Sequence, residues 1–92
     1  MVRKVKEYWY IYMVRCADKT LYTGIAKDIA ERINTHNERK GAKYTRVRLP
    51  VKLVYQERSK DRSAATKREL AIKKLTRKGK LLLIKNKRPA KT

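Results

Sequence analysis

The sequence has one cysteine, no long hydrophobic run and few acidic residues. Cys16 alone cannot form an internal disulfide or build a cysteine-rich zinc site, so we interpret it as an inert hairpin residue. The longest apolar run, Tyr8 to Val14, is far shorter than the roughly 20 residues of a membrane-spanning helix. The N-terminus lacks the pattern of a signal peptide. These absences predict an intracellular, cytoplasmic protein with no role inside a membrane.

The scarcity of acids gives the chain an extreme charge. Twenty-seven Lys and Arg stand against eight Asp and Glu, which makes the formal net charge +19. In residues 60–92, thirteen cations accompany only Asp61 and Glu69. A merely solvated surface would carry both signs, so this excess indicates contacts with a phosphate backbone, whose affinity falls with salt and carries little sequence information. The cations that we assign to nucleic-acid binding are Lys27, Lys43, Arg46, Lys67, Lys73, Lys74 and Arg77.

The length and the absence of linkers and repeats predict one domain over residues 1–92, with a core at about 7–86 and a frayed basic tail at 87–92. Aromatic and β-branched residues predict strands at 8–15, 20–24 and 51–57. Helical patterns follow at 28–37 and 59–78, and a leucine-rich helix at 81–84. We expect Gly41 to stop the first helix and Gly79 to follow the end of the second.

The loop between the first two strands decides whether two tyrosines share a face. A two-residue turn at Asp18 and Lys19 would place Tyr12 and Tyr22 on opposite faces of the sheet. A three-residue loop at 17–19, or a bulge, places them on the same face. A site that uses both tyrosines therefore requires the longer loop.

The first helix has a clear start and carries two polar residues one turn apart. Asp28 is a good N-cap, and Glu31 three residues later completes a capping-box pattern. Arg32 and His36 are spaced i, i+4, so they lie on one stripe of the helix. For His36 the alternative is an ordinary residue near a helix end, where imidazoles are common.

Glu69 is a lone carboxylate among cations in the last third of the chain. It forms either a salt bridge, with Lys73 at i+4 or with Arg62, or a hard oxygen ligand for a divalent cation. Mg²⁺ needs only one or two protein carboxylates, because water and substrate phosphate complete its coordination. Composition leaves both interpretations open.

These residues form an ordered pattern that resembles the GIY-YIG nuclease domain family, and in length the chain looks like its small single-domain bacterial members. The two halves of the signature are Tyr10-Ile11-Tyr12 and Tyr22-Thr23-Gly24, followed by Arg32, His36, Glu69 and Asn86. The chain departs from the family name at Tyr10 and Thr23, and neither change removes a functional side chain. The resemblance implies an α+β fold: a small, mostly antiparallel three-stranded sheet flanked by helices, in the order ββαβαα.

The resemblance also implies a mechanism. A single Mg²⁺ or Mn²⁺ would bind Glu69 and stabilise the leaving oxygen, and Tyr22 would help to deprotonate the attacking water. His36 would accept that proton or orient Tyr22, and Tyr12 would position the water or the phosphate. The guanidinium of Arg32 would neutralise transition-state charge, and Asn86 would fix the end of the site by hydrogen bonding. The alternative for the two tyrosines is a core position with the hydroxyls at the surface.

Three functions compete at this point. The first is a metal-dependent endonuclease that hydrolyses DNA phosphodiester bonds, in DNA repair or recombination. The second is a non-catalytic nucleic-acid-binding module with a nuclease fold, and the third is a membrane-surface or ribosome-associated protein held by charge alone. We expect DNA as the main partner, a protein partner for targeting, and a monomer or weak dimer. Tyr44, inside a basic loop at 42–50, would either stack on a base or serve packing.

Overall fold

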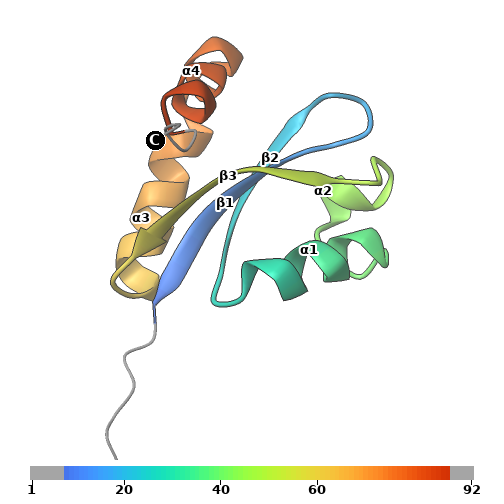
Figure 1. Cartoon of the computed structure of the whole chain (residues 1–92), viewed down its shortest axis with the longest axis horizontal. Coiled ribbons are helices and arrows are strands. Elements are labelled where there is room, and N and C mark those ends of the chain that lie inside the picture. The colour runs from blue at the N-terminus through green and yellow to red at the C-terminus, as the bar shows by residue number, and fades with distance from the viewer. Residues whose placement is uncertain (1–7, 88–92) are drawn as a thin grey trace, which may run out of the picture.

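The computed structural model describes residues 8–87 as a three-stranded antiparallel sheet with helices on both faces (Figure 1). The strands are β1 (Trp9–Arg15), β2 (Leu21–Ala26) and β3 (Lys52–Ser59), in the spatial order β2-β1-β3. The helices are α1 (Ile29–Asn37), α2 (Lys43–Arg46), α3 (Arg62–Lys73) and α4 (Arg77–Lys87). This architecture confirms the expected fold class; α2 is a single turn inside the basic loop. Glu7, where we placed the start of the core, and tail residues 88–92 lie outside the described range.

The central strand β1 is buried on both faces, as its run of apolar residues indicates. Ile11 and Met13 pack against Ala65 and Ile72 of α3. The alternate residues, including Tyr12, belong to a second cluster that α1 covers. In Figure 1, α1 and α2 accordingly lie on one side of the sheet and α3 and α4 on the other. The strand thus presents Tyr12 towards α1, and β2 is left as an edge strand.

The hairpin between β1 and β2 has the three-residue loop that a shared tyrosine site requires. Cys16 N–H donates to Thr20 O at 2.9 Å, which leaves residues 17–19 as the loop. Lys19 has a φ of 70°, the left-handed conformation that closes such a loop. Opposite residues of an antiparallel pair point to the same face, and Tyr12 faces Gly24, two residues beyond Tyr22. Both tyrosines therefore lie on the α1 face, and the predicted loop is confirmed.

Helix α1 begins as predicted but does not end at Gly41. The Asp28 carboxylate accepts a hydrogen bond from Glu31 N at 3.0 Å, which confirms the N-cap. At the other end, Arg39 has a φ of 67°, and Lys40 N–H donates to the carbonyl of Thr35 at 3.0 Å. This is a Schellman motif with an arginine at the position that glycine usually occupies. The prediction that Gly41 stops the helix is wrong, because the chain has already left the helix at Asn37.

The predicted helix at 59–78 is two helices, and Gly79 lies inside the second. Asp61 caps α3 through a 2.8 Å hydrogen bond to Ala64 N, and α3 ends at Lys73. The Thr76 hydroxyl accepts from Gly79 N at 3.0 Å and so caps the start of α4. A threonine side chain that caps a helix start competes with continuation of the preceding helix, and at Thr76 the chain begins a new helix. The leucine-rich segment is helical as expected, within α4.

No helix among residues 8–87 is long and apolar enough to cross a membrane.

Candidate active site

A buried chain of hydrogen bonds runs from Tyr12 through His36 to α2. The Tyr12 hydroxyl and His36 Nε2 are 2.8 Å apart, and His36 Nδ1 lies 2.8 Å from the Thr45 hydroxyl oxygen. Thr45 in turn donates to the carbonyl of Ala42 at 2.9 Å. Tyr12, His36 and Thr45 are all fully buried. We call these three side chains the relay.

The hydrogen bond from Thr45 to the Ala42 carbonyl determines which atom donates in each hydrogen bond of the relay. Because the Thr45 hydroxyl uses its only proton on Ala42, it must accept from His36 Nδ1–H. A neutral imidazole with its proton on Nδ1 has an acceptor at Nε2, so the Tyr12 hydroxyl donates to His36. Sequence reasoning paired His36 with Tyr22; the structure gives it Tyr12 as its hydrogen-bond partner.

The electrostatic environment favours the same protonation states. Burial lowers the pKa of the His36 imidazole, and the positive charge of Arg32 lowers it further. Burial raises the pKa of the Tyr12 phenol; Arg32 opposes this shift, while Tyr22 and Glu69 add to it. At neutral pH the relay therefore holds a neutral imidazole and a protonated phenol. Arg32, Tyr22 and Glu69 all affect the pKa of the Tyr12 phenol, so each lies within electrostatic range of it.

Two glycines make room for the relay. A Cβ on Gly24 would lie 2.6 Å from Tyr12 Oη and 2.8 Å from Cζ, so the tyrosine ring lies directly over the β2 backbone. A Cβ on Gly41 would overlap His36 Nδ1 and approach His36 Cα to 2.9 Å. Neither glycine has a positive φ. Both positions thus require glycine for close approach, which is the structural role of the last residue in the Tyr22-Thr23-Gly24 tripeptide.

Tyr22 lies beside the relay with its hydroxyl available. Its ring packs edge-on against His36, with centroids 5.5 Å apart, and lies 6.5 Å from the ring of Tyr12. Within residues 8–87, no group forms a hydrogen bond with the Tyr22 hydroxyl. The side chain is only partly buried. Tyr22 therefore presents an unused donor and acceptor at the point where the relay reaches the surface.

The basic loop holds Tyr22 in place through a stack. Tyr44 stacks on Tyr22 at 5.9 Å with an interplanar angle of 21°, and the Arg48 guanidinium lies 3.9 Å from the centre of the Tyr44 ring. Arg48 also donates to the carbonyl of Tyr44 at 2.7 Å and to Asp18 of the hairpin loop at 3.0 Å. Of the two interpretations of Tyr44, packing is the contact present in the structure. The stack ties the hairpin loop to α2 across the site.

Glu69 comes from α3, on the opposite face of the sheet from α1. Its carboxylate forms an i, i+4 salt bridge with Lys73 Nζ at 3.1 Å, one of the two partners that the sequence allowed. Lys73 is 45% exposed and Glu69 16% exposed. The charge of Glu69 contributes to the raised pKa of Tyr12, so the carboxylate lies within electrostatic range of the opposite face of the sheet. We call Tyr12, Tyr22, Arg32, His36 and Glu69 the edge cluster.

The donor set of the edge cluster is compatible with a hard divalent cation that keeps most of its water. Within residues 8–87, no group of three or more His, Cys, Asp or Glu forms a metal cage. Glu69 alone supplies a carboxylate oxygen, which suffices for Mg²⁺ or Mn²⁺ when water and a substrate phosphate complete the shell. Its partner Lys73 is on a flexible, largely exposed chain, so it can yield the carboxylate to a cation.

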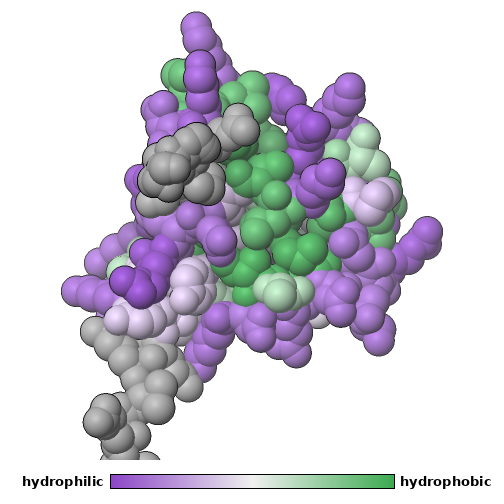
Figure 2. Space-filling model, viewed as in Figure 1, coloured by the Kyte–Doolittle hydropathy of each residue, from purple (hydrophilic) through white to green (hydrophobic). Residues whose placement is uncertain are grey.

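Asn86 shows no contact with the edge cluster. Its side chain is exposed on α4 and makes no hydrogen bond with the described residues. The seven cations that we assign to nucleic acid are all exposed, and they lie after β2, on α2, along α3 and at the start of α4. Figure 2 shows hydrophilic side chains projecting around an apolar area on one face of the molecule. Such placement leaves their ammonium and guanidinium groups accessible to a polyanion.

Sequence reasoning missed two contributors to the site. Thr45 orients the imidazole of His36, and Gly41 makes room for it. Thr45 follows Tyr44 in the basic loop, where no periodic pattern marks it as buried. Gly41 looked like a helix stop because it follows the helix, whereas its contact with His36 arises only in the tertiary fold.

The three-stranded sheet and its flanking helices define a small α+β domain. Residues 8–82 match the GIY-YIG catalytic domain. The chain therefore belongs to the GIY-YIG family, which is a family of nucleases.

Relatives of similar length share more than half of their aligned residues with this chain. A UPF0213 protein of Desulfotalea psychrophila (DP2720) is 58% identical over 78 residues, which span 84% of this chain and 71% of the relative. A UPF0213 protein of Staphylococcus aureus (SAV0488) is 55% identical over 76 residues, 83% and 93% of the two chains.

Two solution NMR structures share the fold. One is the UPF0213 protein BH0048 of Bacillus halodurans, with 38% identity, a TM-score of 0.57 and coverage of 87% of this chain and 85% of that one. The other is EF2693 of E. faecalis, with 41% identity, a TM-score of 0.61 and coverage of 88% and 86%.

Proposed function

We propose that this chain is a divalent-metal-dependent endonuclease that hydrolyses phosphodiester bonds in DNA, in repair or recombination. The observation that carries the proposal is the edge cluster itself: a Tyr22 hydroxyl without a partner within residues 8–87 lies beside a buried proton relay, and a guanidinium and a carboxylate both act electrostatically on Tyr12 of that relay. Membership of a nuclease family supports the reaction class. The net charge of +19 supports a polyanionic substrate.

The two tyrosines differ in their access to water. Tyr12 donates its proton to His36 and is fully buried beside the ring of Tyr22, so it holds the relay and the Tyr22 ring in position. Its direct contact with the water or the phosphate stays a prediction. Tyr22, whose hydroxyl has no partner within residues 8–87, gives up its own proton to bulk water and, as the phenoxide, takes a proton from the attacking water. His36 positions Tyr12 and is not the resting base, because burial and Arg32 both lower the pKa of its imidazole. The relay thus orients a phenol rather than storing a charge.

Arg32 and Glu69 handle the phosphate. The forked donors of Arg32 neutralise negative charge that develops on the phosphate oxygens. Glu69 would hold a Mg²⁺ or Mn²⁺ ion, which would supply Lewis-acid stabilisation of the leaving 3′ oxygen. Lys73 would then release the carboxylate. Asn86 as a hydrogen-bonding residue at the end of the site stays a prediction.

One contact favours a second candidate, a non-catalytic nucleic-acid-binding module. The 3.1 Å salt bridge to Lys73 gives Glu69 a structural role without any metal. Binding alone, however, needs no carboxylate beside Arg32, because a carboxylate repels phosphate unless a cation intervenes. Only a cleavage assay separates the two candidates.

The partners follow from charge and size. Lys27, Lys43, Arg46, Lys67, Lys73, Lys74 and Arg77 bind the phosphate backbone. These scattered contacts bring affinity with little selectivity, so a protein partner directs the domain to its target in the cytoplasm. The chain acts as a monomer or a weak dimer.

The test is a cleavage assay with plasmid, linear and branched DNA in Mg²⁺ or Mn²⁺. The wild type is compared with Glu69→Ala and Arg32→Ala, and with Arg15→Ala, which removes an exposed arginine at the end of β1. Cleavage by wild type and Arg15→Ala that both other variants lose supports the nuclease. Salt-sensitive DNA binding by all four proteins with no cleavage on any substrate rejects it in favour of the binding module.

A further inference from the structure

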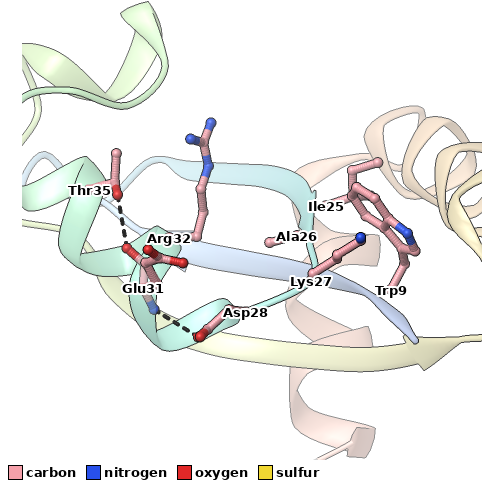
Figure 3. Close-up of a pocket in the computed structure, with 8 residues that line it drawn as sticks. All are labelled: Trp9, Ile25, Ala26, Lys27, Asp28, Glu31, Arg32 and Thr35. Carbon is pink, nitrogen blue, oxygen red and sulfur yellow. Dashed lines mark hydrogen bonds between the residues drawn. The ribbon is translucent and has the colours of Figure 1, made fainter. Parts of the chain in front are cut away.

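A groove of about 380 Å³ extends from the edge cluster around the edge of β2 (Figure 3). Arg32 stands at one end and Trp9 at the other, and the walls come from the ends of β1 and β2 and the first two turns of α1. Its volume is in the range of small-molecule sites. The proposed cleavage chemistry uses only the Arg32 end, so most of the groove has no role in it.

The Trp9 end offers an aromatic surface with cations beside it. Trp9 is partly buried, and Ile25 lies next to it in Figure 3. The Lys27 ammonium and the Arg62 guanidinium lie over the indole ring, 5.6 Å and 5.3 Å from its centre. A nucleobase that displaces one of these side chains stacks on the ring, and the displaced cation then holds the phosphate attached to the base.

The middle of the groove carries acids, which select for a base rather than a phosphate. Asp28 and Glu31 both line it, and the N-terminus of α1 is already satisfied by the Asp28 side chain. The Glu31 carboxylate is exposed and forms no ion pair with the residues between 8 and 87. A carboxylate repels phosphate but accepts hydrogen bonds from the exocyclic amino group of a base, as in the recognition of cytosine N4.

We propose that this groove binds an unpaired nucleobase bearing an exocyclic amino group, next to the phosphate at the edge cluster. The inference rests on the proposed function and narrows its substrate to nucleic acid with a single-stranded segment. A paired base cannot enter, because its neighbours cover both of its faces and its partner occupies the edge that Glu31 reads. Arg32 belongs to both the groove and the edge cluster, so the bound nucleotide adjoins the reacting phosphate.

The sequence supplies a direct probe, because Trp9 is the only tryptophan. Trp9 fluorescence is titrated in EDTA with oligo-dC, oligo-dA, oligo-dT and a fully paired duplex, at equal phosphate concentration. Stacking on Trp9 together with the hydrogen bond from the exocyclic amino group to Glu31 predicts quenching by oligo-dC and oligo-dA at about tenfold lower concentration than by oligo-dT or the duplex. Equal quenching by duplex and single strands overturns the proposal, as does the absence of quenching when labelled DNA shows binding.

Two pairs of variants locate the recognition. Glu31→Ala should remove the preference for oligo-dC over oligo-dT, whereas Glu38→Ala, an exposed acid at the far end of α1, should keep it. Trp9→Leu should weaken binding of labelled oligo-dC about tenfold, and Trp9→Phe should restore most of it. If Trp9→Leu does not fold, the quenching of wild-type Trp9 and the comparison of Glu31→Ala with Glu38→Ala still test the proposal. A preference unchanged in Glu31→Ala contradicts the role of that carboxylate.

These results separate the groove from the nuclease. Because the titrations contain no metal, they do not depend on cleavage. Selective quenching without cleavage on any substrate retains the groove and rejects the nuclease. Cleavage of DNA without selective quenching rejects the groove and retains the nuclease.

Discussion

The chain's three glycines predict a sharp division among glycine-to-alanine variants. All three have negative φ, so an alanine backbone is permitted at each, and the space around the new Cβ decides the outcome. On Gly24 the Cβ lies 2.6 Å from Tyr12 Oη, and on Gly41 it overlaps the His36 ring and lies 2.9 Å from His36 Cα. On Gly79, inside α4, its nearest neighbour is a leucine Cβ at 3.3 Å.

The magnitudes follow from what must move. In Gly24→Ala the Tyr12 ring shifts out of a fully buried position, which costs about 1–3 kcal/mol for overpacking and about 1 kcal/mol for the lost hydrogen bond to His36. Gly41→Ala should cost at least as much, because the His36 backbone cannot rotate away. Gly79→Ala should stay within about 1 kcal/mol of wild type, because alanine favours a helix while the leucine contact is tight.

Thermal unfolding followed by circular dichroism measures these differences. For a chain of this size 1 kcal/mol shifts Tm by about 4–8 °C, so Gly24→Ala and Gly41→Ala should unfold at least about 8 °C below wild type and at least about 4 °C below Gly79→Ala. Both should also lose cleavage activity at temperatures where they remain folded. A Gly24→Ala protein with wild-type Tm and activity would refute the role of close packing against Tyr12.

Three further predictions concern the relay and the end of α1. Thr45→Val should lower the free energy of unfolding by about 1–3 kcal/mol, because it leaves the buried His36 Nδ1–H without an acceptor; a urea midpoint equal to wild type would contradict the relay. His36, the only histidine, has a folded pKa below its unfolded value of about 6.5, so stability should be complete above that pH and fall as the pH drops below it. Urea titrations between about pH 7.5 and 5 should show this loss in wild type and not in His36→Asn. Arg39→Gly should raise Tm, because glycine relieves the cost of about 1 kcal/mol at a φ of 67°, and an unchanged or lower Tm would contradict that cost.

Local signals in the sequence were enough for the sheet and for the start of α1. The alternation in β1 divides its residues between two faces, and the need for a shared tyrosine site implies the three-residue loop that the structure has. Asp28 caps α1 through a hydrogen bond to the backbone N–H of Glu31, only three residues along the chain. These features depend on neighbours in the chain, so they can be predicted without the fold.

The arrangement inside the site depends on contacts between distant segments. His36 and Thr45 lie on different helices, and which tyrosine reaches His36 depends on how α1 packs on the sheet. The break between α3 and α4 was missed because Lys73, Lys74 and Leu75 are good helix formers, while Thr76 acts as a cap only once the chain turns there. Asn86 followed from the family pattern alone, and its position on α4 has no contact that fixes its role.

The most direct test of the account is the single-turnover rate of DNA cleavage by Glu69→Gln at saturating substrate and Mg²⁺. Glutamine keeps the size of the side chain but removes the negative charge that a divalent cation needs, and Glu38→Gln controls for the loss of one acid elsewhere. The account predicts DNA binding like wild type for both variants, with a rate at least about 100-fold lower for Glu69→Gln only. A Glu69→Gln protein that cleaves at the wild-type rate would show that Glu69 is only the salt-bridge partner of Lys73, and would contradict the proposed site.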